Sequence, residues 1–283
     1  MTESTKNHTA VPAAKPIAPY VGGKRNLAAR LVEKIEAVPH KIYAEPFVGM
    51  GGVFLRRTTA PQLEVINDAQ NDVATLFRIL QRHYPQFVET LRFQVTSRTE
   101  FYRLVQTDPD TLTDLERAAR FLYLQRTAFG GKVAGRSFGV DKTRARFNLT
   151  DVEPMLADLH ERLAGVVIEC LDFDAFLARY DAPGALFFCD PPYWGSEGYY
   201  GPQFKRADFE RLSATLKGLK GRFILTLNDV PEVRDLFGWA AIEPVDTTYS
   251  LAKAGTKKVG ELIISTPKPP HKPKRKRNHG RRK

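Results

Sequence analysis

The sequence predicts an α/β fold in which helices cover a parallel sheet and a mainly helical segment interrupts the chain. Short apolar runs alternate with helical patterns over residues 17–83 and again over 150–266. A glycine-rich turn directly follows the first strand-like run. The stretch 84–149 lacks this alternation and contains helical patterns instead. Alternating strands and helices are typical of parallel sheets, so the flanks are expected to form one split α/β domain around a separate insert.

The spacing of apolar residues predicts the individual elements. A helix is expected over residues 26–38, where Leu27, Leu31 and Ile35 recur at helical spacing. Residues 42–44 form a strand that enters the glycine turn, and a helix is expected to begin at residues 53–55. Further strands are predicted at residues 63–66, 166–169, 185–189, 223–227 and 261–265, and further helices at residues 73–80, 87–95 and 115–124.

The two ends of the chain differ from its body. Residues 1–16 are polar and rich in Ala and Pro, which predicts a disordered leader. Residues 267–283 contain nine Lys or Arg and no acid, which predicts a disordered basic tail. No apolar run approaches the roughly 18 residues that a membrane span requires, and no secretory signal is present. We therefore expect a cytoplasmic protein that does not contact a membrane.

The positive charge is concentrated in two places. The 283 residues include 43 Lys and Arg against 32 Asp and Glu, a net charge of +11. The tail contributes +9 and residues 117–146 contribute +7, which leaves −5 for the rest of the chain. One charged stretch is usually a solvated surface, but two in an otherwise acidic chain favour contact with nucleic acid.

The two cysteines indicate neither a disulfide framework nor a metal site. Cys170 and Cys189 lack the Cys or His neighbours whose spacing would bind zinc. We expect both to be buried in a protein of a reducing compartment, with no bound metal.

The glycine turn is a candidate cofactor site. Residues 45–51 read Glu-Pro-Phe-Val-Gly-Met-Gly after a strand, where backbone amides can approach a ligand. Phe54 replaces the third glycine of a dinucleotide fingerprint, and Ala18 stands where a phosphate-binding loop before Lys24 would need glycine. Asp68 ends the next strand, where an acid can accept hydrogen bonds from ribose hydroxyls. On this motif alone, the turn is equally well interpreted as a binding site for a nucleoside-type cofactor or as a purely structural connection.

A second motif follows the most apolar strand. Asp190, Pro191, Pro192 and Tyr193 come directly after residues 185–189. The prolines supply no amide donors, so carbonyl oxygens and the Asp190 carboxylate can converge beside the planar Tyr193 ring. Such acceptors suit a ring with an exocyclic amine, because they hold the amine hydrogens and stabilise positive charge during methylation. The alternative is that Pro-Pro merely ends a strand, which is the less common reason for this combination.

In their order along the chain, these motifs resemble the Dam-like, D12 class of adenine-specific DNA methyltransferases. Residues 19–24 are similar to the family's N-terminal cofactor motif, residues 45–54 to its glycine motif and Asp190 to Tyr193 to its catalytic motif. Residues 121–127 resemble the start of its target-recognition domain, although Gln125 stands where the family more often has Asn. The segment that follows differs from relatives that recognise GATC, so a GATC target is not assumed.

The resemblance implies a Rossmann-like S-adenosylmethionine-dependent methyltransferase sheet at residues 17–83 and 150–266, with an inserted DNA-recognition domain at residues 84–149. Catalytic residues would be Asp190, Pro191, Pro192 and Tyr193. The cofactor S-adenosylmethionine would be bound by Tyr20, Lys24, Glu45, Phe47, Gly49, Gly51, Asp68 and Asp190. DNA would be bound by Arg126, Phe129, Lys132, Arg136, Arg144 and Arg146.

The predicted reaction is methylation of an adenine amine after the base leaves the duplex. We expect a monomer of bacterial or phage origin that acts on double-stranded DNA near the nucleoid, with a cognate restriction endonuclease as a candidate partner. Two alternatives are an amine methyltransferase that acts on RNA or protein, and a non-catalytic DNA-binding relative. A digest of nucleosides from DNA and RNA after reaction tests the first alternative, and titration with the cofactor tests the second.

Overall fold

A seven-stranded mixed sheet forms the centre of the molecule, in the order β5-β4-β2-β6-β7-β9-β8. The computed structural model describes residues 8–140, 143, 145–199, 204–251 and 255–267. The first five strands of the order are parallel, β9 is antiparallel to β7, and β8 at the edge is antiparallel to β9. The strands are β2 (Ile42–Glu45), β4 (Leu63–Asn67), β5 (Val167–Glu169), β6 (Ala185–Cys189), β7 (Arg222–Asn228), β8 (Ala241–Leu251) and β9 (Gly255–Ser265).

The strand order reverses between β2 and β6, which lie side by side with Ala44 paired to Phe187. Ligands of open α/β sheets bind outside the carboxyl ends of the strands at such a switch point. The glycine turn leaves β2 and Asp190 follows β6 at this place, so the fold brings together two motifs that are far apart in the sequence. The predicted α/β fold is confirmed.

Helices cover both faces of the sheet, because β6 is apolar on both sides. Leu186 and Phe188 pack into the core of one face, whereas Phe187 and Cys189 pack into the core of the other. A buried parallel strand has this continuous apolar pattern. The first face is covered by α1 (Ala28–Glu36), α2 (Asn71–Arg82) and α6 (Leu149–Arg162), and the second by α7 (Phe173–Tyr180), α8 (Arg206–Gly218) and α9 (Pro231–Leu236).

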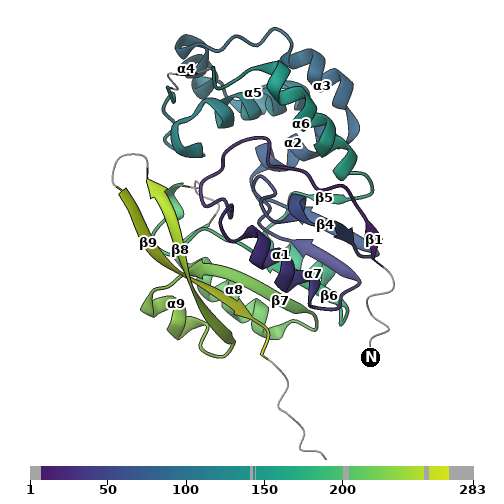
Figure 1. Cartoon of the computed structure of the whole chain (residues 1–283), viewed down its shortest axis with the longest axis vertical. Coiled ribbons are helices and arrows are strands. Elements are labelled where there is room, and N and C mark those ends of the chain that lie inside the picture. The colour runs from purple at the N-terminus through teal and green to yellow at the C-terminus, as the bar shows by residue number, and fades with distance from the viewer. Residues whose placement is uncertain (1–7, 141–142, 144, 200–203, 252–254, 268–283) are drawn as a thin grey trace, which may run out of the picture.

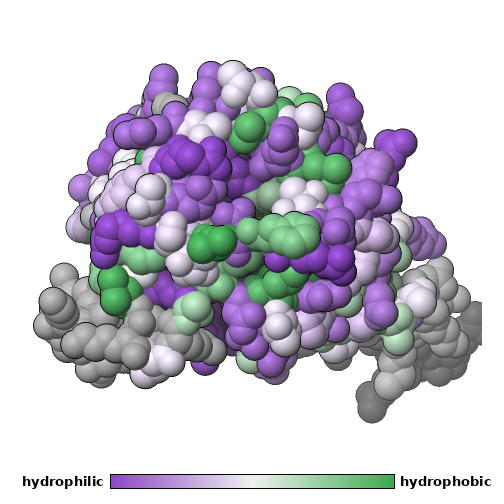
Figure 2. Space-filling model, turned by 90° about the horizontal axis from the view of Figure 1, so that it is seen from above, coloured by the Kyte–Doolittle hydropathy of each residue, from purple (hydrophilic) through white to green (hydrophobic). Residues whose placement is uncertain are grey.

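The insert is helical and extends the first face. It contains α3 (Tyr84–Leu91), α4 (Arg98–Gln106) and α5 (Asp114–Thr127), with the short 3₁₀ helices η2 (Pro109–Thr111) and η3 (Phe129–Gly131). The helix α5 begins with a capping box between Thr113 and Glu116 and packs against α2 and α3. Its apolar residues share one core with the sheet. Figure 1 shows this helical group above the sheet, and Figure 2 shows that its upper face is mostly hydrophilic around a hydrophobic patch.

The N-terminal segment is more ordered than the sequence predicts. The strand β1 (Thr9–Ala10) pairs with β3 (Thr59–Ala60), and Ala14 and Ile17 are buried. The segment crosses between the helical group and the sheet (Figure 1). The prediction of a disordered leader is therefore wrong for residues 8–16, because a few apolar side chains pack without forming a periodic pattern. The basic tail at residues 268–283 lies outside the described residues.

Three smaller details also differ from expectation. Residues after the glycine turn form the 3₁₀ helix η1 (Phe54–Arg56) and not an α-helix, because Arg57 adopts an extended backbone. Cys170 is exposed, whereas Cys189 is buried as expected. The hairpin β8–β9 begins well before the predicted strand and extends past the end of β7.

Another 3₁₀ helix is η4 (Glu197–Tyr199). Within the described ranges, no helix is long and apolar enough to cross a membrane.

Candidate active site

A cleft of about 1340 Å³ opens at the carboxyl ends of β2, β4 and β6. This volume exceeds what a small ligand commonly needs, so the cleft has room for a nucleoside-type cofactor and part of a second ligand. The cleft is lined by these residues of the predicted cofactor and catalytic sets: Tyr20, Lys24, Glu45, Phe47, Gly49, Asp68, Asp190 and Pro192. Pro191, Tyr193 and Gly51 lie beside it without lining it.

The glycine turn closes tightly against the N-terminal motif. Gly49 has a φ of +50°, and a Cβ there would lie 3.0 Å from the Tyr20 ring. Gly51 has a φ of +71°, and a Cβ there would overlap the Leu55 side chain at 2.8 Å. Both positions therefore require glycine. The absence of a side chain at Gly49 leaves room for the Tyr20 ring against the turn, and its absence at Gly51 leaves room for the Leu55 side chain.

Asp68 is fixed in place by two backbone amides. Its Oδ2 accepts a hydrogen bond from Gly49 N at 3.0 Å and its Oδ1 accepts one from Gln70 N at 2.9 Å. The Tyr20 hydroxyl donates to Gln70 Oε1 at 3.2 Å. Burial raises the pKa of Asp68 to about 6, while the two amide hydrogen bonds act to lower it. Each carboxylate oxygen keeps a second lone pair that can accept a ribose hydroxyl.

Asp190 is held on one oxygen only. Lys24 Nζ lies 2.7 Å from Oδ1, and the Thr226 hydroxyl donates to the same atom at 2.7 Å. In the part of the chain that the structure describes, Oδ2 makes no hydrogen bond, and the side chain is 19% exposed. Burial raises the pKa of Asp190, against the opposing effect of Lys24. The arrangement fixes the carboxylate and leaves Oδ2 to a ligand.

The segment after Asp190 is tied to the neighbouring strand. Trp194 N donates to Asn228 Oδ1 at 2.9 Å, and Asn228 Nδ2 donates to Trp194 O at 3.1 Å. This pair of hydrogen bonds fixes the backbone next to Tyr193. Lys24 Nζ lies 4.4 Å from the centre of the Tyr193 ring, a cation–π contact. The catalytic motif is thus connected to both the N-terminal motif and β7.

Glu45 is the second carboxylate of the cleft. The Tyr43 hydroxyl donates to Glu45 Oε1 at 2.6 Å, and both residues are buried. Burial raises the pKa of Glu45 to about 8, because the ionised carboxylate loses its hydration there. Phe47 packs against Phe173 and Phe204, which gives the cleft an aromatic wall for a planar group.

The residues predicted to bind DNA are not all placed at one surface. Arg126 and Arg146 line the cleft and donate to the backbone carbonyls of Ile17 and Ala128. Phe129 is exposed at 51%. Arg136 is half-buried beside Gln125, and burial lowers its pKa to about 10. Lys132 is half-buried, and Arg144 lies outside the described residues.

Part of the basic stretch at residues 117–146 stabilises the fold. Arg117 pairs with Asp72 at 2.6 Å and with Asp110 at 2.7 Å. Arg120 is buried and donates to the Leu104 carbonyl at 2.8 Å. These two charges are therefore compensated inside the helical group.

Several residues that support the site were not identified from the sequence. Thr226 is a polar residue in the middle of an apolar strand, which was the available signal for its contact with Asp190. Gln125 is fully buried and donates to both Pro19 O and Gly131 O, so it joins the insert to the N-terminal motif. The contacts of Tyr43, Gln70 and Asn228 leave no comparable pattern in the sequence.

Comparisons with known proteins show which sequences and structures the chain is similar to. The model of the D12 class N6 adenine-specific DNA methyltransferase family matches residues 20–251. The chain is 26% identical over 272 residues to the Type II methyltransferase M1.LlaDCHI of Lactococcus lactis subsp. cremoris, covering 89% of this chain and 95% of that protein. It is 30% identical over 286 residues to the DNA N-6-adenine-methyltransferase of Escherichia phage P1, covering 92% of this chain but 37% of the phage protein.

Solved structures align over most of the chain at low similarity. A proposed RNA methyltransferase from Pyrococcus horikoshii has a TM-score of 0.41 and 12% identity, with 89% of this chain and 91% of that chain covered. A precorrin-8w decarboxylase from Methanobacterium thermoautotrophicum has a TM-score of 0.36 and 12% identity, with 91% and 99% covered.

Proposed function

Because the chain belongs to the D12 class of N6 adenine-specific DNA methyltransferases, we propose that its cleft binds S-adenosylmethionine and that Asp190 receives the adenine amine. The observation that carries this proposal is that Asp190 is held through only one of its two carboxylate oxygens. Lys24 and Thr226 occupy Oδ1, while Oδ2 is left for a donor from a ligand.

The residues of the cleft fit the cofactor. Asp68 is held by two amides in a position to accept ribose hydroxyls, and the aromatic wall at Phe47 suits the adenine ring. Two carboxylic side chains, the buried Glu45 and the partly exposed Asp190, line the cleft that would receive the sulfonium group. When bound, the cofactor supplies an electrophilic methyl group.

The residues of the catalytic motif would perform the remaining steps of the reaction. Asp190 Oδ2 and the Pro191 carbonyl would accept the two amine hydrogens, which frees the nitrogen lone pair from conjugation with the ring. The amine must lose one proton during methylation, and Asp190 would hold it, because its Oδ2 would already accept a hydrogen bond from the amine and burial raises its pKa. Tyr193 would stack on the flipped base, next to Pro192.

The insert is the proposed DNA-recognition unit. The exposed Phe129 stands at the turn after α5, where it can fill the space that an extruded adenine leaves in the duplex. We expect Lys132, Arg136 and Arg144 to contribute to phosphate or base contacts. Arg126 and Arg146, which line the cleft, would act where DNA meets the cofactor site.

Duplex DNA, a monomeric state and a cytoplasmic location belong to the same proposal. The similarity to a Type II methyltransferase supports a cognate restriction endonuclease as a partner.

The test is transfer of labelled methyl groups from S-adenosylmethionine to unmethylated DNA by the wild type and by Asp190→Asn. We expect transfer by the wild type and a large loss in the variant, which keeps the size of the side chain but removes its charge. Equal transfer by both proteins contradicts the assignment of Asp190. A variant that binds the cofactor with wild-type affinity shows that the loss lies in the reaction.

A further inference from the structure

Glu45 is held from behind by a buried tyrosine and a buried arginine. The Tyr43 hydroxyl donates to Glu45 Oε1 at 2.6 Å, and the Arg57 guanidinium lies 3.8 Å from the centre of the Tyr43 ring. All three residues are almost fully buried, at exposures of 2%, 0% and 0% for Glu45, Tyr43 and Arg57. Glu45 lines the cleft, whereas Tyr43 and Arg57 do not. Glu45 therefore reaches the cleft, while the two side chains that support it are buried behind it.

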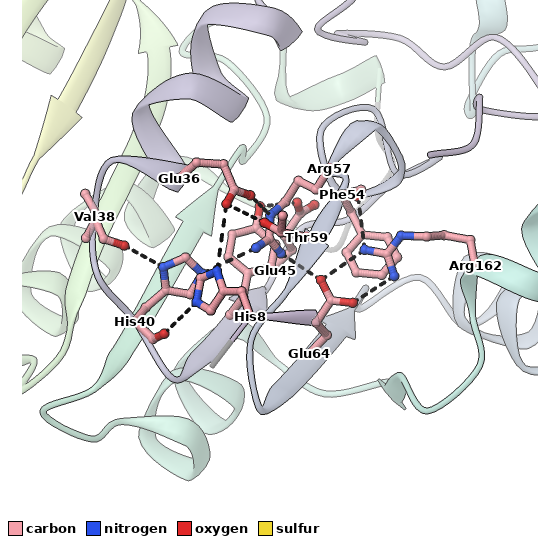
Figure 3. A network of polar contacts seen from close by, with 11 residues as sticks. His8, Glu36, Val38, His40, Glu45, Phe54, Arg57, Thr59, Glu64 and Arg162 are labelled. Atoms are coloured by element: carbon pink, nitrogen blue, oxygen red, sulfur yellow. Dashed lines mark hydrogen bonds and ion pairs between the residues drawn. The ribbon is translucent and has the colours of Figure 1, made fainter. Parts of the chain in front are cut away.

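A network of ion pairs fixes Arg57 in turn (Figure 3). Arg57 donates to Glu64 Oε1 at 2.7 Å and to Glu36 Oε1 at 3.1 Å. Arg162 of α6 holds both oxygens of Glu64, at 2.7 and 2.9 Å. Burial lowers the pKa of His40 to about 4, so its neutral ring accepts from Arg57 at 3.3 Å. Because so many partners must move together, Arg57 and Tyr43 form a rigid base for Glu45.

Among the described residues that line the cleft, none forms an ion pair with Glu45. Lys24 pairs with Asp190 at 2.7 Å. The groups whose charges act on Glu45 are Arg57 behind it, Asp190 across the cleft and Glu64 beyond Arg57, with the Tyr43 hydroxyl as its donor. Burial and the two carboxylates favour the protonated form, and Tyr43 and Arg57 favour the ionised form, with a resulting pKa of about 8. Near neutral pH, the free protein therefore carries Glu45 largely protonated.

We propose that Glu45 responds to the charge of the cofactor: it ionises when a sulfonium occupies the cleft, so the methyl donor binds with release of a proton and the neutral thioether product does not. This proposal rests on the proposed function. Tyr43 and Arg57 are positioning residues that set the pH at which the proton is released. The proton passes to solvent, and no bond of the cofactor changes. The donor would then bind more tightly than the product as pH rises.

Calorimetry in two buffers of different ionisation enthalpy measures the released proton directly. We expect S-adenosylmethionine to release about one proton near neutral pH and S-adenosylhomocysteine to release clearly less. The donor's Kd should tighten by up to about tenfold per pH unit between about pH 6 and pH 8. Because both ligands carry the same ribose, proton release linked to Asp68 is common to both and cancels in the comparison.

Three variants assign the effect to these residues. Glu45→Gln should abolish the difference in proton release between the two ligands. Tyr43→Phe removes the hydroxyl that favours the ionised carboxylate, so the pH dependence of the donor's Kd should shift to higher pH. Tyr123→Phe is the matched control, because Tyr123 is also fully buried but its hydroxyl donates to the backbone at Val95 and Ser97. It should behave as the wild type.

The outcomes separate this inference from the proposed function. If the wild type binds neither ligand, the cofactor assignment fails and this inference fails with it. If both ligands bind with equal proton release, or if Glu45→Gln keeps the difference, the cofactor assignment stands and this inference is overturned. A Tyr43→Phe variant with an unshifted profile contradicts the positioning part.

Discussion

The contact between Thr226 and Asp190 allows a sharp test of the catalytic arrangement. Thr226 is fully buried in β7, and its hydroxyl donates to Asp190 Oδ1 at 2.7 Å. Thr226→Val removes this donor and keeps a β-branched side chain of similar size. A hydrogen bond to a charged group contributes about 1.5–3 kcal/mol, so kcat should fall by roughly 10- to 150-fold if the bond orients the carboxylate for the reaction.

The pH profile and the binding constant identify the cause of that loss. Thr226 lies outside the lining of the cleft, so the Kd for S-adenosylmethionine should change little. The Thr226 hydrogen bond opposes the raised pKa of Asp190, so its loss should move the acidic limb of the kcat profile to higher pH. Single-turnover methyl transfer to DNA across a pH series measures the shift of the acidic limb, and the same assay at several cofactor concentrations measures the Kd.

Thr75→Val serves as the control for the loss of a buried threonine hydroxyl. Thr75 is 1% exposed and donates to Asn71 Oδ1 at 3.1 Å within α2, away from the cleft. This variant should retain the wild-type kcat. If Thr226→Val also retained it while Asp190→Asn lost activity, the reasoning that Oδ1 must be held for the reaction would be refuted.

Four further predictions follow from other contacts. Asn228→Ala removes two hydrogen bonds to the backbone after the catalytic motif, which together contribute about 1–3 kcal/mol. This variant should lower kcat by a larger factor than it raises the Kd of the cofactor. A wild-type kcat contradicts this prediction. In the free protein, the pKa of Glu45 lies above its unfolded value, so the native state binds the extra proton and stability falls as pH rises from about 4.5 to about 8. Melting curves of Glu45→Gln should show a weaker fall over that range, and an unchanged slope refutes the assignment. Arg162→Met breaks a buried ion pair and should lower Tm on the order of 10 °C, whereas a shift of a degree or two would show that the network adds little. Phe129→Ala should reduce the fluorescence gain of 2-aminopurine at the target position about tenfold while leaving cofactor binding unchanged.

The sheet was predictable because its central strand β6 is buried on both faces. Residues 185–189 are apolar without interruption, and the structure places them in the centre of the sheet with both faces covered. The motifs at the ends of β2 and β6 then meet for a topological reason, because parallel strands end at one edge. Their order along the chain was the basis of the family resemblance.

The supporting contacts were not predictable because they join distant parts of the chain. Thr226 is 36 residues from Asp190, and Arg117 is 45 residues from the Asp72 that it pairs with. A stretch of basic residues therefore predicted a DNA contact where part of the charge stabilises the helical group. The N-terminal segment was missed because its buried residues, Ala14 and Ile17, are too few to form a pattern.

The most direct test of the central claim is the identity of the methylated nucleoside. DNA and RNA are incubated separately with the protein and S-adenosylmethionine, digested to nucleosides and analysed by mass spectrometry. The account predicts N6-methyldeoxyadenosine from DNA with the wild type, and almost none with Asp190→Ala. A methylated base other than adenine, methylation of RNA alone, or an undiminished product with Asp190→Ala would contradict it.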